Sequence, residues 1–128
     1  MGRSLSVLIA LLDETDVGRT VAREAVAQSQ GHHDLVIPVT AFSESIVALY
    51  RRSRRDGQCA EAALVALGRL VDVTRDIASR AAQLRATRQI KLPDALILAT
   101  AMHVAADQIL TLDRRWRGVD LRVRLLEP

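Results

Sequence analysis

The sequence predicts an α/β domain in which helices alternate with short buried strands. Asp34–Pro38 is a short apolar run with β-branched residues, and Gln108–Leu112 is similar in length and character, as in strands buried on both faces. Longer segments between them carry apolar residues at helical spacing. This alternation favours a three-layer α/β/α arrangement around a mostly parallel central sheet. The 128 residues suffice for one such domain, so we expect a single domain over 1–128.

The first part of the chain contains three predicted elements. Residues 7–12 are apolar throughout and are followed by acidic residues, as in a short buried element. Residues 17–28 place apolar side chains on one stripe, which predicts a helix that ends near Gly31. Residues 34–38 end in a proline, and we interpret them as a buried strand.

The middle of the chain predicts two helices and a strand. Thr40 is typical of a helix N-cap, and the apolar residues after it predict a helix that runs to about Arg55. We expect the pair Asp56–Gly57 to break this helix. A second helix of strong helix formers follows over 60–67, and the alternating residues 69–73 predict a short strand.

The last part of the chain opens with Thr74, which is suited to cap a helix that runs to about Arg88. Pro93 and Asp94 are both favoured in the first turn of a helix. The remaining predicted elements are a helix over 92–106, a strand over 108–112, a turn or short helix over 114–116, and a strand over 121–126.

Composition excludes several classes of protein. No apolar stretch approaches the roughly 20 residues of a transmembrane helix, so we expect no membrane span. The single Cys59 excludes an internal disulfide framework and a multi-cysteine zinc site, and it fits a reducing, cytoplasmic setting. Aromatic residues make up only 2%, which argues against an aromatic platform for stacking bases. The excess of 18 basic over 15 acidic residues is only a weak sign of a nucleic-acid partner.

Three carboxylates stand out by their positions. Glu44 lies in the first turn of the helix after one predicted strand, Asp94 lies in the first turn of the helix over 92–106, and Asp113 lies at the carboxyl end of another strand. Parallel sheets build their sites at the carboxyl ends of their strands, so we expect these side chains at one edge. Clustered carboxylates repel unless a cation neutralises them, and oxygen ligands suit Mg²⁺ or Mn²⁺. The alternative is that each carboxylate only caps a helix or complements its dipole.

Three stretches of the chain resemble a known family. Asp94-Ala95 at a helix start, then Ala106-Asp-Gln-Ile-Leu-Thr-Leu-Asp113 with Trp116 three residues later, resembles the C-terminal signature of PIN-domain ribonucleases, in particular the VapC-type toxins of bacterial toxin–antitoxin pairs. Pro38-Val-Thr-Ala-Phe-Ser-Glu44 resembles the middle acidic motif of that family, and residues 7–12 resemble the helix after its first motif. The resemblance covers essentially the whole chain.

The resemblance implies a metal-dependent endoribonuclease that a cognate antitoxin holds inactive. By position, Glu44, Asp94 and Asp113 match the carboxylates that carry Mg²⁺ or Mn²⁺, with Glu44 as a ligand or as the base that orients water. Thr111 matches a hydroxyl residue that supports the site. Asp107 also matches the signature, and we interpret it as structural.

The chain departs from the family pattern at its amino terminus. The family opens with an apolar strand that ends in an aspartate, and by spacing Ser4 stands at that position. Only three residues precede Ser4, so we expect the first strand to be nearly absent. Three explanations stay open: a start assigned too late, a degenerate relative with impaired activity, or a site in which three carboxylates, Ser4 and water hold the ion more loosely.

Basic and apolar surfaces predict the partners. Arg114 and Arg115 beside Asp113 are candidates for binding RNA phosphate, and the alternative is a surface ion pair with Asp113. Arg51 and Arg52 at a helix end are further candidates, where the alternative is a favourable charge on a solvated helix terminus. The apolar helices over 42–50 and 60–67 predict a homodimer or antitoxin surface, or else plain core. The alternative function is an impaired PIN-like module that binds RNA or antitoxin without cleaving.

Overall fold

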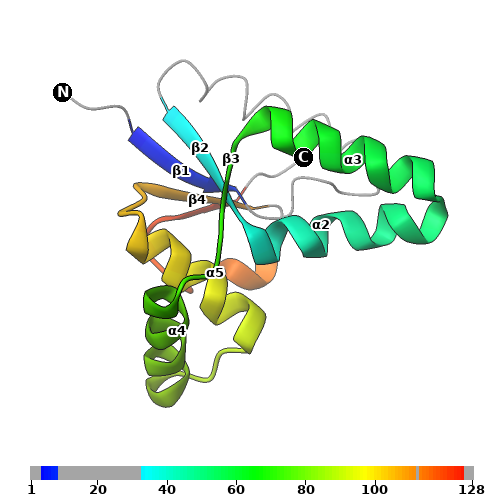
Figure 1. Cartoon of the computed structure of the whole chain (residues 1–128). Coiled ribbons are helices and arrows are strands. Elements are labelled where there is room, and N and C mark those ends of the chain that lie inside the picture. Colours follow the sequence, from blue (N-terminus) through cyan, green and yellow to red (C-terminus); the bar gives the residue numbers. More distant parts are fainter. Residues whose placement is uncertain (1–3, 9–32, 112, 126–128) are drawn as a thin grey trace.

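The computed structural model describes residues 4–8, 33–111 and 113–125 (Figure 1). Its strands are β1 (Ser4–Leu8), β2 (His33–Pro38), β3 (Arg69–Val71), β4 (Gln108–Thr111) and β5 (Val123–Leu125). Its helices are α2 (Val39–Arg52), α3 (Arg54–Leu67), α4 (Arg75–Thr87), α5 (Leu92–His103) and the short 3₁₀ helix η1 (Arg114–Trp116). The helix predicted over 17–28 and the apolar residues 9–12 lie outside the described residues.

The described strands form one sheet in the order β3-β2-β1-β4-β5, and every neighbouring pair is parallel. The chain builds outward from β1 through β2 to β3, then returns to add β4 and β5 on the other side of β1. The strand order therefore reverses between β1 and β4. In open parallel sheets, ligands bind outside the carboxyl ends of the strands at such a reversal.

Strand β1 corrects the expectation that the first strand is nearly absent. Ser4–Leu8 lies at the centre of the sheet, where it pairs with both β2 and β4. The sequence of this segment, Ser-Leu-Ser-Val-Leu, has the apolar character that is typical of strands in parallel sheets. Residues 7 and 8 therefore belong to a strand and not to the helix that the family resemblance implied for residues 7–12. Pairing with two neighbouring strands decides their conformation.

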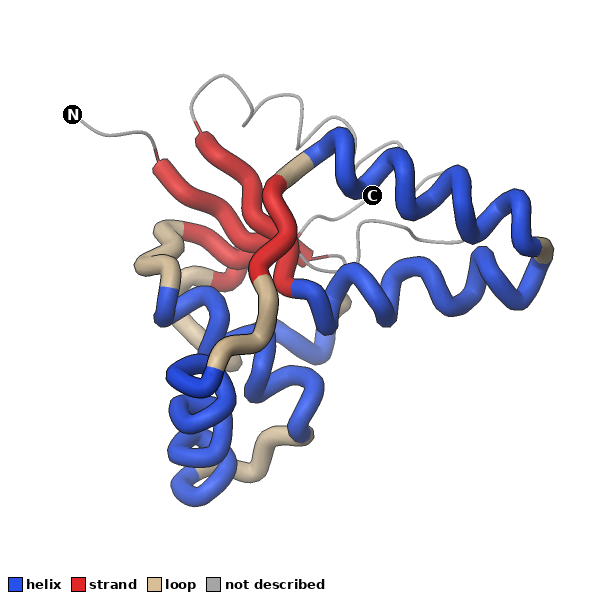
Figure 2. The backbone as a smooth tube through the Cα atoms, in the orientation of Figure 1, coloured by secondary structure: helices blue, strands red, loops and turns tan. Residues whose placement is uncertain are grey.

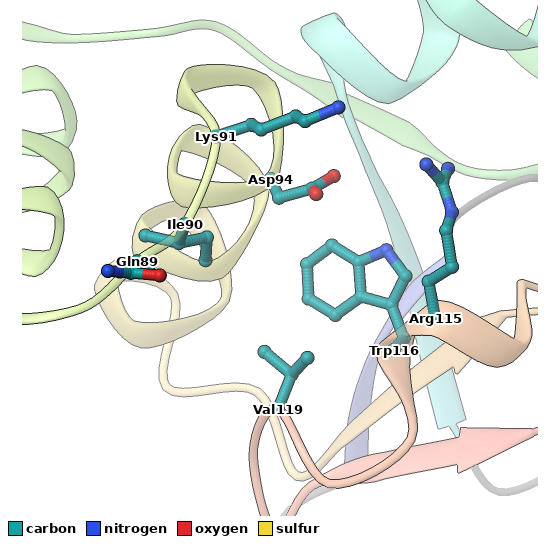
Figure 3. A pocket seen from close by; sticks show the side chains of 7 residues that line it. All are labelled: Gln89, Ile90, Lys91, Asp94, Arg115, Trp116 and Val119. Carbon is teal, nitrogen blue, oxygen red and sulfur yellow. The ribbon is translucent and has the colours of Figure 1, made fainter.

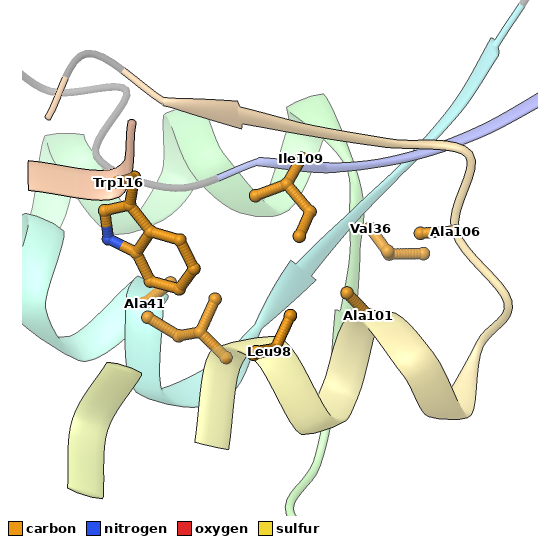
Figure 4. Packing of buried hydrophobic residues seen from close by; sticks show 8 residues of the cluster. Val36, Ala41, Leu98, Ala101, Ala106, Ile109 and Trp116 are labelled. Atoms are coloured by element: carbon orange, nitrogen blue, oxygen red, sulfur yellow. The ribbon is translucent and has the colours of Figure 1, made fainter. Parts of the chain in front are cut away.

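Successive strand residues face two separate cores, as the period of two along a strand requires. Leu35 and Ile37 of β2 pack in a cluster with residues of α2 and α3, whereas Val36 packs in a cluster with residues of α5. Figure 4 shows the second cluster, in which Trp116 and Ile109 lie across from α5. Helix α4 packs on α5 through Ile77, Ala81, Ala95 and Ala99. The predicted three-layer α/β/α fold is confirmed.

The boundary between α2 and α3 differs from the prediction. Pro38 in extended conformation occupies the N-cap of α2, so the helix begins before Thr40 and the predicted Thr40 cap is wrong. Ser53 ends α2 with an extended backbone, and its Oγ accepts a 3.0 Å hydrogen bond from the Asp56 amide to begin α3. Asp56 and Gly57 therefore lie inside α3, and the break predicted there is wrong because the Ser53 cap decides the boundary.

Helices α2 and α3 form an antiparallel pair that projects away from the sheet (Figure 2). They approach closely at Gly57, where an added Cβ would lie 2.3 Å from ring atoms of Tyr50. The Tyr50 hydroxyl donates a hydrogen bond to Glu61 across the same contact. Among the described residues, no helix combines the length and apolarity that crossing a bilayer requires.

The remaining predictions for the second half of the chain fit the structure closely. The Thr74 hydroxyl accepts a 3.2 Å hydrogen bond from the Ile77 amide and caps α4, as predicted. Helix α5 begins at Leu92 with Pro93 and Asp94 in its first turn. It ends at His103, three residues earlier than predicted, and Ala105 adopts a positive φ of 55° just after it.

Candidate functional site

The topology brings the three predicted carboxylates to one edge of the sheet. Helix α2 leaves the carboxyl end of β2 and carries Glu44 in its second turn, one turn later than predicted because the helix begins at Val39. Asp113 follows the carboxyl end of β4. Helix α5 runs back toward the start of β4, so its first turn, with Asp94, lies at the same carboxyl edge.

Electrostatic coupling shows that these carboxylates share one environment. The pKa of Glu44 is raised above its ordinary value, first by partial burial and then by the negative charges of Asp94 and Asp113, while Arg115 opposes the rise. A negative charge is therefore unfavourable at Glu44, and a nearby cation is favourable. Clustered carboxylates raise one another's pKa in this way, and a cation bound between them opposes the rise.

Arg115 already supplies one positive charge to this cluster. Its Nη2 lies 2.7 Å from Oδ2 of Asp113, and its Nε lies 3.1 Å from both carboxylate oxygens. Asp113 also accepts a 2.9 Å hydrogen bond from the Arg115 amide, which caps η1. These bonds lower the pKa of Asp113. The pKa of Arg115 is raised by Asp113 first, and also by Asp94 and Glu44, so all three carboxylates attract the guanidinium.

Two threonines lie close to the acidic residues in the chain. The hydroxyl of Thr111, which is fully buried, accepts a 3.0 Å hydrogen bond from the Asp113 amide and so fixes the backbone that presents this carboxylate. The hydroxyl of Thr40, in the first turn of α2, is buried and has no hydrogen-bond partner among the described residues. Sequence reasoning assigned Thr40 only a capping role.

The predicted RNA-binding arginines divide into two groups. Arg114 is exposed beside Asp113, whereas Arg115 is held by that carboxylate and is not free to bind phosphate in this arrangement. Arg51 and Arg52 end α2, about 11 Å along the helix from Glu44 at 1.5 Å per residue, and Arg52 pairs with Asp56 at 3.5 Å. The structure therefore does not bring Arg51 and Arg52 to the acidic cluster.

Ser4 is not at the acidic edge. It begins β1 and pairs with His33, whereas the carboxyl end of this strand at Leu8 pairs with Leu110. The strand from Ser4 to Leu8 spans about 13 Å. The structure therefore does not bring Ser4 to the three carboxylates, and its supporting role at a metal stays a prediction that this placement does not favour.

The donor set fits a divalent cation in chemical type but not in its present arrangement. Three carboxylates are suitable ligands for Mg²⁺ or Mn²⁺. Within the ranges that the structure describes, however, no three His, Cys, Asp or Glu side chains lie close enough together to hold an ion. Arg115 occupies the Asp113 oxygens that an ion would need, so binding an ion through Asp113 requires this ion pair to open.

Sequence reasoning missed a cavity beside the acidic cluster. It has a volume of about 300 Å³ and lies between the segment before α5 and the segment that follows Arg115 (Figure 3). Its lining comprises Gln89, Ile90, Lys91, Asp94, Arg115, Trp116 and Val119. Lys91, the one lysine of the chain, directly before α5, was the only signal in the sequence.

Solved structures of low sequence identity share this fold. A chain of a toxin–antitoxin complex from Klebsiella pneumoniae matches with 24% identity and a TM-score of 0.77, covering 95% of this chain and 98% of that one. A chain of VapBC2 from Rickettsia felis, bound to a DNA fragment from its promoter, matches with 11% identity and a TM-score of 0.78, covering 96% and 99%.

A third structure is VapC20 of Mycobacterium tuberculosis, described as a toxin that cleaves the sarcin-ricin loop. It matches with 20% identity and a TM-score of 0.67, covering 83% of this chain and 87% of that one. No curated protein matches the sequence. The PIN domain family matches residues 6–121, which include β2 to α5 and all three carboxylates. The predicted resemblance is confirmed, and the chain belongs to the PIN domain family.

Proposed function

We propose that this PIN domain is a metal-dependent endoribonuclease of the VapC kind, which hydrolyses phosphodiester bonds in RNA. The observation that carries the proposal is the convergence of Glu44, Asp94 and Asp113 at the carboxyl edge of the sheet, and their mutual electrostatic influence supports it. Burial and like charges raise the pKa of Glu44, which is the situation that a bound cation relieves. The description of VapC20 as an RNA-cleaving toxin with the same fold supports RNA as the substrate.

In this proposal Asp94 and Asp113 hold Mg²⁺ or Mn²⁺, and Glu44 is a further ligand or the base that orients the attacking water. A bound divalent ion activates water and stabilises a phosphoryl oxygen. Thr111 supports the site by fixing the Asp113 backbone. Opening of the Arg115–Asp113 pair frees the carboxylate for the ion and the guanidinium for a phosphate of the substrate.

We further propose a cognate antitoxin as partner, because chains of the same fold occur in toxin–antitoxin complexes. Val47, Tyr50 and Val65 expose 41%, 38% and 58% of their surface on the projecting α2–α3 pair, which offers apolar area to such a partner or to a second copy of the chain. A homodimer remains a prediction. The exposed, unpaired Cys59 is consistent with a cytoplasmic setting.

One observation favours a second function. Arg115 satisfies Asp113, and the described residues contain no preformed three-ligand site, as in an impaired module that binds RNA or antitoxin without cleaving. The two functions differ in what happens when an ion is added. In the nuclease, Asp94 and Asp113 would hold the added ion, Arg115 would release Asp113, and RNA would be cleaved. In the impaired module, the Arg115–Asp113 pair and the RNA would both stay intact.

The test is an RNA cleavage assay with Mg²⁺ or Mn²⁺ on tRNA and on a sarcin-ricin loop fragment. Asp94→Asn should abolish cleavage and leave RNA binding intact, because it removes a metal ligand and a negative charge, and losing a negative charge does not weaken the attraction of RNA phosphates. Asp76→Asn is the matched control, since Asp76 also lies in the first turn of a helix, α4, and it should cleave normally. Binding without cleavage by the unaltered protein, with either ion, would favour the impaired module.

A further inference from the structure

The cavity beside the acidic cluster has a mixed lining. Ile90 and Val119 provide apolar walls, and Trp116, which is 3% exposed, forms the wall opposite Ile90 (Figure 3). Lys91 and Arg115 bring positive charge to the end that is nearest to Asp94. Apolar walls with a few polar groups at one end are typical of a ligand site.

A second hollow of about 330 Å³ adjoins the first. The two share Gln89, Ile90 and Val119 in their linings, and the second extends to Arg88 and Gly118. Together they form a groove between the connection that joins α4 to α5 and the turn that follows η1. The groove leads away from Asp94 and Arg115, and Arg88 adds positive charge at its far end.

Hydrogen bonds hold both walls of the groove in place. Arg88 reaches across with its Nη1, which donates a 3.3 Å bond to the carbonyl of Val119, and Arg85 Nε donates a 3.2 Å bond to the carbonyl of Ile90. The other wall is a tight turn in which the Val119 amide bonds the Trp116 carbonyl at 3.0 Å. Gly118 supplies the φ of 78° that this turn requires. The hollows are therefore preformed.

We propose that this groove binds two successive unpaired nucleotides of RNA, one base in each hollow, next to the phosphate at the acidic cluster. The inference rests on the proposed function and names the substrate subsites beside its site. Each hollow is near the lower limit of small-molecule sites, which is about 300 Å³, so it suits one base rather than a duplex. Bases become available to such hollows only where RNA is single-stranded or looped out.

The lining assigns a role to each residue in the groove. The aliphatic side chains of Ile90 and Val119 cover a base on its faces. The exposed amide of Gln89 lies where both hollows meet, and it can donate and accept hydrogen bonds at a base edge. Lys91 at one end and Arg88 at the other contact the flanking phosphates. This distribution of positive charge favours a polyanion over an apolar side chain of a protein partner.

The test uses Trp116 as an internal probe, because it is the only tryptophan in the chain and lines the first hollow. A single-stranded oligoribonucleotide is titrated into the full-length protein in EDTA, and the tryptophan fluorescence is recorded. We expect a saturable change in fluorescence. Gln89→Ala should weaken this binding about fivefold, from the loss of one or two hydrogen bonds. Val119→Phe, which fills both hollows, should weaken it at least as much.

Gln83→Ala is the matched control, because Gln83 is an exposed glutamine on α4 outside both hollows, and it should bind RNA normally. The proposal that the groove binds RNA is overturned if Gln89→Ala and Gln83→Ala bind RNA with equal affinity, or if RNA binds without a change in fluorescence. Either result counts against the groove even if the protein cleaves RNA. Normal RNA binding with weakened antitoxin binding in Gln89→Ala also overturns it, in favour of a protein site. Fluorescence-detected binding that depends on Gln89, without cleavage in Mg²⁺ or Mn²⁺, supports the groove and removes only the nuclease proposal.

Discussion

Replacing Arg115 by glutamine should tighten the binding of Mn²⁺ to the acidic cluster about fivefold. In the structure, the guanidinium of Arg115 makes three contacts of 2.7–3.1 Å with the Asp113 carboxylate. An ion that uses Asp113 must first open this pair. Glutamine keeps much of the length and polarity of the side chain but removes the positive charge, so the carboxylate becomes available to the ion.

The expected magnitude follows from the exposure of the pair. Arg115 has 78% of its side chain exposed and Asp113 has 22%, so solvent and salt screen their attraction. Pairs of this kind contribute at most about 1 kcal/mol, and the near-bidentate geometry places this one at the upper end of that range. Because 1.4 kcal/mol corresponds to tenfold in affinity, removing about 1 kcal/mol of competition gives about fivefold.

Isothermal titration calorimetry with Mn²⁺, at low and at physiological salt, measures this change directly. Arg114→Gln is the control, since it removes the same charge from the adjacent position and should alter affinity by less than twofold. The fivefold gain should shrink as salt rises. Equal affinities for Arg115→Gln and Arg114→Gln would refute the competition between guanidinium and ion. No binding of Mn²⁺ to any of these proteins would refute the metal site itself.

Three further substitutions test other parts of the structure. Glu44→Gln should raise the Tm at pH 7 without metal, since the raised pKa of Glu44 means that its charge opposes folding; this gain should vanish below pH 4.5, where Glu44 is protonated in both states. Gly57→Ala should destabilise the protein by about 1 kcal/mol, because the added Cβ would clash with the Tyr50 ring. In a Tyr50→Ala background the same substitution should stabilise the protein by about 1 kcal/mol, because alanine has the higher helix propensity. Urea unfolding measures both changes. Ser4→Asp should raise neither Mn²⁺ affinity nor RNA cleavage, because Ser4 lies at the far end of β1.

Each of these substitutions has an outcome that contradicts the reasoning. A gain in Tm for Glu44→Gln that is equal at pH 4 and pH 7 would exclude charge repulsion as its cause. A change of the same sign for Gly57→Ala in both backgrounds would exclude the close approach to Tyr50. Tighter Mn²⁺ binding by Ser4→Asp would place the amino end of β1 at the metal site, against its pairing with His33.

Local patterns predicted the elements whose cause is local. The Thr74 cap and the start of α5 at Pro93 and Asp94 depend on residues within one turn, and the structure has both. The boundary at Ser53 was missed because Asp56 and Gly57 are typical helix breakers, whereas here the Ser53 hydroxyl caps a helix that runs through them. Strand β1 was missed for a related reason, since its central place depends on pairing with two strands that are distant in sequence.

The sequence predicted that three acidic residues lie at one edge of the sheet, but it did not predict the groove beside them. Glu44, Asp94 and Asp113 could be placed together because parallel topology sends the carboxyl ends of strands to one edge. For Arg115 the sequence favoured a phosphate ligand over a surface pair with Asp113, because spacing does not reveal that the guanidinium folds back onto this carboxylate. The groove joins the segment before α5 to the turn at Gly118, and no pattern in either segment predicts that contact.

The register of β1 also limits where a further ligand for the site can come from. Leu8 pairs with Leu110, one residue before Thr111, whose hydroxyl fixes the Asp113 backbone. The carboxyl end of β1 therefore lies beside the strand that presents Asp113, at the point where the strand order reverses. A fourth ligand supplied by this strand has to come from its carboxyl end, because Ser4 at its amino end is about 13 Å away. An ion at this edge would therefore be held by Glu44, Asp94 and Asp113 together with whatever group the carboxyl end of β1 presents, and not by Ser4.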